Sequence, residues 1–146
     1  MKQPQYKDIA SRHRFATERR MAMERGDRPW GYYLVLHEDA GYKVKQFVVK
    51  PGGRLSLQRH RRRAEHWQVV RGEAEVTCGK EIVRLLPGGS IDIPLGALHR
   101  VESVGKENLV VIEVQMGEYV GEDDIERFED DYGRAAKAAA IPPKMK

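Results

Sequence analysis

Apolar and polar residues alternate along most of the chain between residues 31 and 116, with the period of two that is typical of β-strands. Turn residues rich in glycine, proline or aspartate interrupt this pattern, for example at 38–41, 51–53 and 87–89. Many short strands joined by glycine turns favour an antiparallel sandwich or barrel, here a jelly roll. The expected strands cover residues 31–37, 42–50, 55–60, 66–70, 73–77, 82–86, 90–94, 99–103 and 109–116.

The two ends of the chain lose the strand pattern and favour helices. Apolar residues gather toward one side over residues 6–25, which predicts a helix that the Gly-Asp-Arg-Pro segment at 26–29 ends. An alanine-rich run at 134–140 predicts a short C-terminal helix that two prolines terminate. We therefore expect an N-terminal helical arm, an all-β domain and a C-terminal tail, covering residues 1–27, 28–134 and 135–146 respectively.

Composition and charge exclude several classes of protein. A chain of 146 residues with 40% hydrophobic and 33% charged residues fits one globular domain without a membrane span or signal peptide. The single cysteine, Cys78, cannot form an internal disulfide, so the cytoplasm is the expected location. The basic first 28 residues lack interleaved aromatic residues and any reader motif, which argues against nucleic-acid binding.

The densest set of chemical groups lies at residues 57–67. Gln58 and His60 share one face of an expected strand, and Glu65 follows a turn that can bring it back beside His60. A second glycine-containing turn delivers His99. Imidazole and oxygen donors together suit one divalent transition metal ion such as Zn, Mn, Fe, Co or Ni, with zinc favoured. The alternative for these residues is a polar strand edge without a metal.

Two segments resemble the two cupin motifs. The first reads Gly52-(five)-Gln58-x-His60-(four)-Glu65-(six)-Gly72, and the second reads Gly88-(five)-Pro94-x-Gly96-(two)-His99-(three)-Ser103. Glutamine replaces the first histidine of the first motif, and serine stands where asparagine is usual in the second. The resemblance implies a cupin jelly-roll barrel whose metal ligands are Gln58, His60, Glu65 and His99.

Further segments resemble the cupin domain of type II mannose-6-phosphate isomerases, which is often fused behind a mannose-1-phosphate guanylyltransferase domain. The similarity runs from Arg28 to Arg134 and includes Arg63-Ala64-Glu65-His66-Trp67 and Ile112-Glu113-Val114-Gln115. That family implies glutamine as a metal ligand at position 58. One departure is His60-Arg61-Arg62-Arg63, where the family usually reads His-His-His-Arg. Because no guanylyltransferase domain fits ahead of Arg28, we expect only the isomerase half.

The resemblance implies a metal-dependent aldose–ketose isomerase that interconverts mannose 6-phosphate and fructose 6-phosphate. Such a reaction moves a proton between C1 and C2 through an enediol and needs a Lewis acid and a base. The candidates for the base are Glu113, Lys45 and His66, although Glu113 and Lys45 can equally be exposed strand residues. A regular strand turns His66 away from Glu65, which counts against it.

The substrate phosphate needs cationic partners, and the planar guanidinium of arginine matches a phosphate well. The candidates are Arg100, Arg127 and Arg134. Arg100 is favoured because it follows His99 directly, whereas the acidic C-terminal stretch offers Arg127 and Arg134 ready ion-pair partners.

Two other functions remain open alongside the isomerase. One is a cupin enzyme that acts on another phosphorylated or nucleotide sugar, and the other is a non-catalytic sugar-sensing module that uses the arginine-rich arm as a contact surface. As partners we expect a phosphorylated sugar substrate, and neither nucleic acid nor a membrane. Spare edge strands of a small jelly roll also favour a homodimer.

Overall fold

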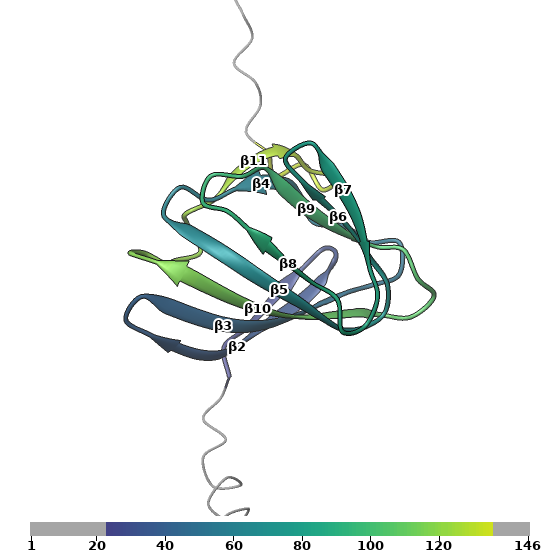
Figure 1. Ribbon diagram of the computed structural model, residues 1–146, viewed down its shortest axis with the longest axis horizontal. Coiled ribbons are helices and arrows are strands. Elements are labelled where there is room, and N and C mark those ends of the chain that lie inside the picture. Colours follow the sequence, from purple (N-terminus) through teal and green to yellow (C-terminus); the bar gives the residue numbers. More distant parts are fainter. Residues whose placement is uncertain (1–22, 136–146) are drawn as a thin grey trace, which may run out of the picture.

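The computed structural model describes residues 23–135, which form two antiparallel β-sheets that face each other (Figure 1). One sheet has the strand order β1-β2-β3-β10-β5-β8, and the other has the order β11-β4-β9-β6-β7. The strands are β1 (Arg25–Arg28), β2 (Gly31–Asp39), β3 (Tyr42–Val49), β4 (Leu57–Arg59), β5 (Arg63–Arg71), β6 (Ala74–Cys78), β7 (Glu81–Leu85), β8 (Ser90–Ile93), β9 (His99–Ser103), β10 (Leu109–Gly117) and β11 (Glu126–Glu129).

The expected all-β architecture is confirmed, and no helix occurs among residues 23–135. The predicted C-terminal helix lies almost entirely outside the described residues, and so does the predicted N-terminal helix up to residue 22. The end of that predicted helix is wrong, because Arg25 begins strand β1. Within the described residues, no helix is long and apolar enough to cross a membrane.

Two strands were not expected from the sequence. Strand β1 pairs with β2 from Arg25 opposite Leu34 to Arg28 opposite Gly31, where a turn was predicted. Gly26 allows this pairing because a Cβ at that position would lie 2.1 Å from Cε1 of the Tyr33 ring. Strand β11 lies in the acidic C-terminal stretch and pairs with β4.

Large apolar side chains fill the space between the two sheets. Trp30 and Trp67 both pack edge-on against Phe47, with ring centroids 6.3 and 5.5 Å apart, respectively. Each buried aromatic side chain removes roughly 150–250 Å² from water, so this row contributes a large part of the apolar stabilisation. Trp67 also packs edge-on against His99 at 5.4 Å, which connects the apolar core to a polar region.

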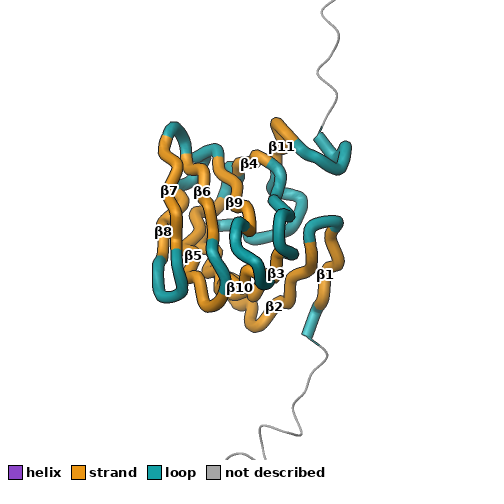
Figure 2. The backbone as a smooth tube through the Cα atoms, turned by 90° about the vertical axis from the view of Figure 1, so that its right-hand side faces the viewer, coloured by secondary structure: helices purple, strands orange, loops and turns teal. Residues whose placement is uncertain are grey.

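The register of the strands fixes which polar residues enter the space between the sheets. Within one sheet, Glu65 lies opposite Gln115 and Trp67 lies opposite Glu113. A shift by one residue would turn these side chains to the outer face, so register and chemistry depend on each other. Figure 2 shows β7 and β8 together at one side of the sandwich, with β1 and β11 at the opposite side.

Candidate metal and sugar site

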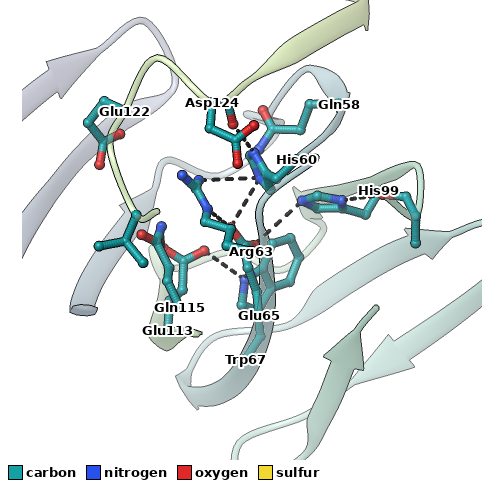
Figure 3. Close-up of polar contacts among 12 residues, drawn as sticks. Gln58, His60, Arg63, Glu65, Trp67, His99, Glu113, Gln115, Glu122 and Asp124 are labelled. Carbon is teal, nitrogen blue, oxygen red and sulfur yellow. Dashed lines mark hydrogen bonds and ion pairs between the residues drawn. The ribbon is translucent and has the colours of Figure 1, made fainter. Parts of the chain in front are cut away.

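Two histidines and a glutamate meet in the interior between the sheets (Figure 3). His60 directly follows β4, and His99 begins β9 in the same sheet, while Glu65 comes from β5 in the facing sheet. His60 Nε2 lies 3.1 Å from Glu65 Oε1, and His99 Nε2 lies 3.5 Å from Glu65 Oε2. All three side chains are at most 2% exposed. The predicted convergence of these residues is therefore present.

Backbone carbonyl groups orient both imidazole rings. The Nδ1 atoms of His60 and His99 lie 2.6 Å from the carbonyl oxygen of Asp124 and 2.9 Å from that of Ala97. When each Nδ1–H donates to its carbonyl, the lone pair of each Nε2 faces the carboxylate of Glu65. Histidines that bind metals are held in this way by a second hydrogen bond from the other ring nitrogen.

The donor atoms fit a divalent cation. Nε2 of His99 is buried and has no hydrogen-bond partner among the described residues. Burial would raise the pKa of Glu65, but the neighbouring imidazoles of His60 and His99 hold that pKa well below its usual range. A charged carboxylate facing two imidazole lone pairs is the donor set that zinc and similar ions bind. When one ligand atom is taken from each of the three residues, these three atoms all lie within 4.8 Å of one another.

Gln58 lies opposite His99 in the β4–β9 pair and lines the adjoining pocket. Its Oε1 accepts a hydrogen bond from Ser56 Oγ at 2.8 Å. Its place as a fourth metal ligand stays a prediction.

Arg63 contacts the same cluster, which the sequence did not indicate. Its Nε donates to Glu65 Oε1 at 3.0 Å, and its Nη2 lies 3.3 Å from His60 Nε2. A third bond, from Nη1 to the carbonyl oxygen of Gly121, holds the guanidinium in place at 3.0 Å. Arg63 therefore uses acceptor atoms that a metal ion would also use.

A second carboxylate, Glu113, adjoins the cluster. The Trp67 indole N–H lies within hydrogen-bonding distance of both Glu65 Oε2, at 3.0 Å, and Glu113 Oε2, at 2.9 Å. Gln115 Nε2 donates to Glu113 Oε1 at 2.8 Å. Burial, together with the nearby charge of Glu65, raises the pKa of Glu113 to about 8. Glu113 is thus buried beside the cluster, as one of the predicted base candidates.

Lys45 is also brought to the pocket, but it is paired with a carboxylate. Its ammonium group donates to Glu122, and Lys43 lies 3.6 Å from the same carboxylate. Lys43 also donates to the carbonyl oxygen of Val120 at 2.7 Å. Burial opposes ionisation of Glu122, yet the two lysines lower its pKa. Sequence reasoning missed Glu122 because it lies in an acidic stretch that reads as solvated surface.

The structure does not bring His66 or Arg100 to the pocket. His66 lies on the outer side of β5, where its Nδ1 is 2.7 Å from Asp92 Oδ1 and its side chain is 43% exposed. Arg100 donates to the carbonyl oxygen of Leu55 and to Glu129 Oε2. Alternation along β9 separates its side chain from that of His99. Of the three predicted phosphate-binding arginines, Arg127 and Arg134 do line the pocket.

The arginines that replace the family's usual histidines contact the acidic segment between β10 and β11. The main-chain N–H groups of Arg61 and Arg62 both donate to the carboxylate of Asp124, each at 3.0 Å. Their side chains pair with Glu126 and Glu118, respectively. The arginine run therefore holds the acidic segment beside His60.

One pocket, with a cavity volume of about 80 Å³ and partly open to solvent, adjoins the cluster. It is lined by side chains that can bind hydroxyl groups, by aromatic rings and by cations, namely Gln58, Glu65, Glu113, Gln115, Glu122, Trp30, Tyr33, Phe47, Leu55, Ile125, Lys45, Arg28, Arg63, Arg127 and Arg134. Such a lining suits a polar, negatively charged ligand more than an apolar one.

Comparisons with known proteins support the resemblance to the cupin domain of type II mannose-6-phosphate isomerases. The family model described as "Mannose-6-phosphate isomerase C-terminal" matches residues 16–130, which includes residues ahead of Arg28. The xanthan biosynthesis protein XanB of Xanthomonas campestris is 55% identical over 107 residues, which are 73% of this chain and 23% of XanB. The alginate biosynthesis protein AlgA of Pseudomonas aeruginosa is 52% identical over 77% of this chain and 23% of AlgA.

Solved structures show the same fold at low sequence identity. The capsular polysaccharide assembling protein CapF of Staphylococcus aureus has a TM-score of 0.65 and 22% identity, covering 79% of this chain and 34% of that one. An oxalate decarboxylase variant of B. subtilis has a TM-score of 0.66 and 19% identity, covering 73% of this chain and 30% of that one. The Schizosaccharomyces pombe Cnp3 cupin domain has a TM-score of 0.61. These similarities support the expected cupin fold.

The predicted interconversion of mannose 6-phosphate and fructose 6-phosphate is wrong for this chain. The chain spans less than a quarter of the length of the curated relatives described. The Escherichia coli relative, 51% identical over 73% of this chain and 22% of its own length, is named mannose-1-phosphate guanylyltransferase. Because the shared segment also occurs in a protein named for a different reaction, it does not specify the isomerase reaction. A cupin that acts on another sugar agrees better with these relatives.

The chain's membership of the family does not depend on whether it interconverts mannose 6-phosphate and fructose 6-phosphate. The matched residues include every strand of the fold and the whole His60, Glu65 and His99 cluster. The chain therefore belongs to the family of mannose-6-phosphate isomerase C-terminal domains.

Proposed function

We propose that this chain binds one divalent metal ion, with zinc favoured, and acts on a phosphorylated or nucleotide sugar other than mannose 6-phosphate. The observation that carries the proposal is the buried pair of imidazole nitrogens turned toward Glu65, which also lines the polar pocket. His60, Glu65 and His99 would hold the metal ion, with Gln58 as the fourth ligand. Manganese, iron, cobalt and nickel suit the same donors.

The pocket lining supports a sugar as the ligand. Gln58, Gln115 and Glu113 offer amide and carboxylate groups that can bind hydroxyl groups, and Trp30 and Tyr33 add aromatic surface. Arginines at the same pocket suit a phosphate group. The name of the E. coli relative supplies mannose 1-phosphate as one candidate ligand, and its guanosine diphosphate sugar as another.

A bound divalent cation would supply Lewis-acid polarisation of a sugar oxygen. Glu113 is the candidate that holds or moves a proton, because Trp67 and Gln115 fix its carboxylate while no cation pairs with it among the described residues. Lys45 is a weaker candidate, since Glu122 already accepts from its ammonium group. For a sugar phosphate that opens to a free carbonyl group, the reaction class proposed is proton transfer at the carbon next to that carbonyl, beside the polarised oxygen.

A second candidate function is a non-catalytic sugar-sensing module. One observation favours it: Arg63 donates to Glu65 and lies 3.3 Å from His60 Nε2, so a side chain already satisfies part of the metal cluster. In such a module, Arg63 would stabilise the carboxylate in place of a metal ion, and the pocket would bind sugar without turnover.

Nuclear magnetic resonance in D₂O with zinc-loaded protein tests the proposal. The panel contains glucose 6-phosphate, mannose 1-phosphate and the guanosine diphosphate sugar, each measured with and without a chelator. We expect metal-dependent conversion or deuterium incorporation for at least one of them, and loss of that reaction but not of binding in Glu113→Gln. Binding without any reaction would overturn the proposed enzyme and favour the sensing module. Absence of binding across the panel would overturn both.

A further inference from the structure

Three arginines from separate segments line the pocket at the side where β1 and β11 lie. Arg28 ends β1, Arg127 lies on β11, and Arg134 follows β11. The sequence singled out Arg127 and Arg134 but not Arg28. Figure 2 shows β1 and β11 on the same side of the sandwich, although they belong to different sheets.

Two of these arginines have no carboxylate partner among the described residues. Arg134 makes two side-chain hydrogen bonds to Asp130, at 2.9 and 2.8 Å, so its charge is balanced within the fold. Arg28 donates to the carbonyl oxygen of Asp27 at 2.9 Å and lies 3.5 Å from the hydroxyl of Tyr33. Neither of these atoms is a charged acceptor. Arg28 and Arg127 make no ion pair in residues 23–135.

Arg127 lacks more than a counter-ion. Its Nε is buried and has no hydrogen-bond partner in the part of the chain that the structure describes. Burial lowers the pKa of Arg127, and the neighbouring charges of Arg134 and Arg28 lower it further. A partly buried guanidinium with an unsatisfied donor is costly unless a ligand supplies the missing acceptor.

Two carboxylates of the pocket are already paired with cations. Glu122 accepts from Lys45, and Glu65 accepts from Arg63. The pocket cations that remain without a carboxylate partner among the described residues are therefore Arg28 and Arg127. A phosphate monoester and a diphosphate diester each carry about two negative charges near neutral pH, and both present several acceptor oxygens.

We propose that Arg28 and Arg127, backed by Arg134, form the subsite that holds a dianionic phosphate group of the ligand. This assignment rests on the proposed function and makes it more specific, because it assigns the phosphate end of the sugar to the β1–β11 side of the pocket. Arg127 donates through its buried Nε, and Arg28 closes the subsite from the opposite sheet. Arg100, the favoured sequence candidate, has no part in it.

Isothermal titration calorimetry of the metal-free full chain with orthophosphate and with pyrophosphate tests the subsite without any sugar chemistry. We expect Arg127→Ala and Arg28→Ala each to weaken binding by roughly tenfold or more. Arg61→Ala is the matched control, because it removes the same charge from a side chain that is 70% exposed and pairs with Glu126 outside the pocket. The control should bind within about twofold of the unmodified chain.

Thermal unfolding distinguishes a variant that has lost phosphate binding from one that has failed to fold. Phosphate should raise the Tm of the unmodified chain and of Arg61→Ala, but not that of the two subsite variants. Equal phosphate binding by all four proteins, or loss of binding in Arg61→Ala alone, would overturn the assignment. If phosphate binds through Arg28 and Arg127 but no sugar of the panel reacts or binds, only the proposed function fails.

Mannose 1-phosphate and the guanosine diphosphate sugar distinguish the two sources of the phosphate group. A monoester site binds the sugar phosphate in an Arg127-dependent manner and excludes the nucleotide sugar. A diphosphate site binds the nucleotide sugar in an Arg127-dependent manner and excludes the sugar phosphate. Arg127-independent binding of both ligands would contradict the subsite while leaving the sugar function intact.

Discussion

His60 Nδ1 and the main-chain carbonyl oxygen of Asp124 lie 2.6 Å apart, which ties one imidazole of the cluster to a segment 64 residues later in the chain. The carboxylate of Asp124 accepts from the main-chain N–H groups of Arg61 and Arg62. One residue thus fixes both the ring of His60 and the turn that follows it. Asp124 therefore positions His60, which we propose as a metal ligand.

Asp124→Ala removes the two hydrogen bonds that hold its carbonyl group in place. We expect the affinity for zinc to fall by roughly tenfold or more, as is typical when the support of a ligating histidine is lost. Calorimetric zinc titration measures this directly. Asp123→Ala is the control, since Asp123 accepts only from Tyr119 among the described side chains. The zinc affinity of this control should not change. Equal losses in both variants would contradict the role of Asp124.

Glu122 should make stability depend on pH in the acid range. Lys45 and Lys43 lower its pKa in the folded chain, so its contribution is complete above the unfolded pKa of about 4.5 and is lost as pH falls through the lower folded pKa. Glu122→Gln should therefore be less stable at pH 7, by about 2 kcal/mol after allowance for partial exposure. The difference should shrink below pH 4.

Urea unfolding at a series of pH values checks this prediction. Glu118→Gln is a matched control in the same segment, because Glu118 is 73% exposed and, within residues 23–135, pairs only with Arg62. That control should differ from the unmodified chain by well under 1 kcal/mol at every pH. A Glu122→Gln deficit that stays constant from pH 7 to pH 3 would argue against the lysine pairs as its cause.

The paired substitution Arg61→His and Arg62→His restores the residues that are usual in the family. Both side chains point to the acidic segment and neither lines the pocket. We expect zinc affinity to stay within about twofold and stability to change by less than about 1 kcal/mol. Metal analysis together with urea unfolding measures both quantities. A large gain in zinc affinity would mean that one of these positions can supply a ligand.

Trp67→Phe removes the indole N–H that lies between two buried carboxylates. Glu65 and Glu113 then each lose a donor, so the variant should unfold about 1–3 kcal/mol more easily. Trp30→Phe is the comparison, because Trp30 packs edge-on against the same Phe47 but donates no side-chain hydrogen bond among the described residues. Denaturant unfolding of the metal-free proteins should show the larger loss for Trp67→Phe. Equal losses would assign the effect to ring volume alone.

The sequence predicted the strands well because their side-chain alternation reflects the local backbone. Strand β5 shows the largest displacement, beginning at Arg63 instead of residue 66. The run of arginines there reads as a charged turn, and only the pairing with β10 extends the strand across it. Strand β1 was missed for a related reason, since Gly26 is a turn signal unless Tyr33 is known to pack over it.

The cluster was predictable in part. Alternation placed Gln58 on the inner face, and the motif spacing brought His60, Glu65 and His99 together. The contacts of Arg63, Glu122 and Asp124 were not predictable, because they depend on where the segment after β10 returns. No period in the sequence specifies which carboxylate of an acidic stretch will face a buried lysine. The path of the segment after β10 in the folded chain determines which carboxylate does so.

His99 lies in one sheet and His60 directly follows a strand of that sheet, whereas Glu65 lies in the other, so the cluster connects the two halves of the sandwich. An ion held there would have to leave before the sheets could separate. Release of the ion and the first separation of the two sheets would then have the same activation barrier. The lifetime of the bound ion would set a lower limit on how long the folded chain resists being pulled apart.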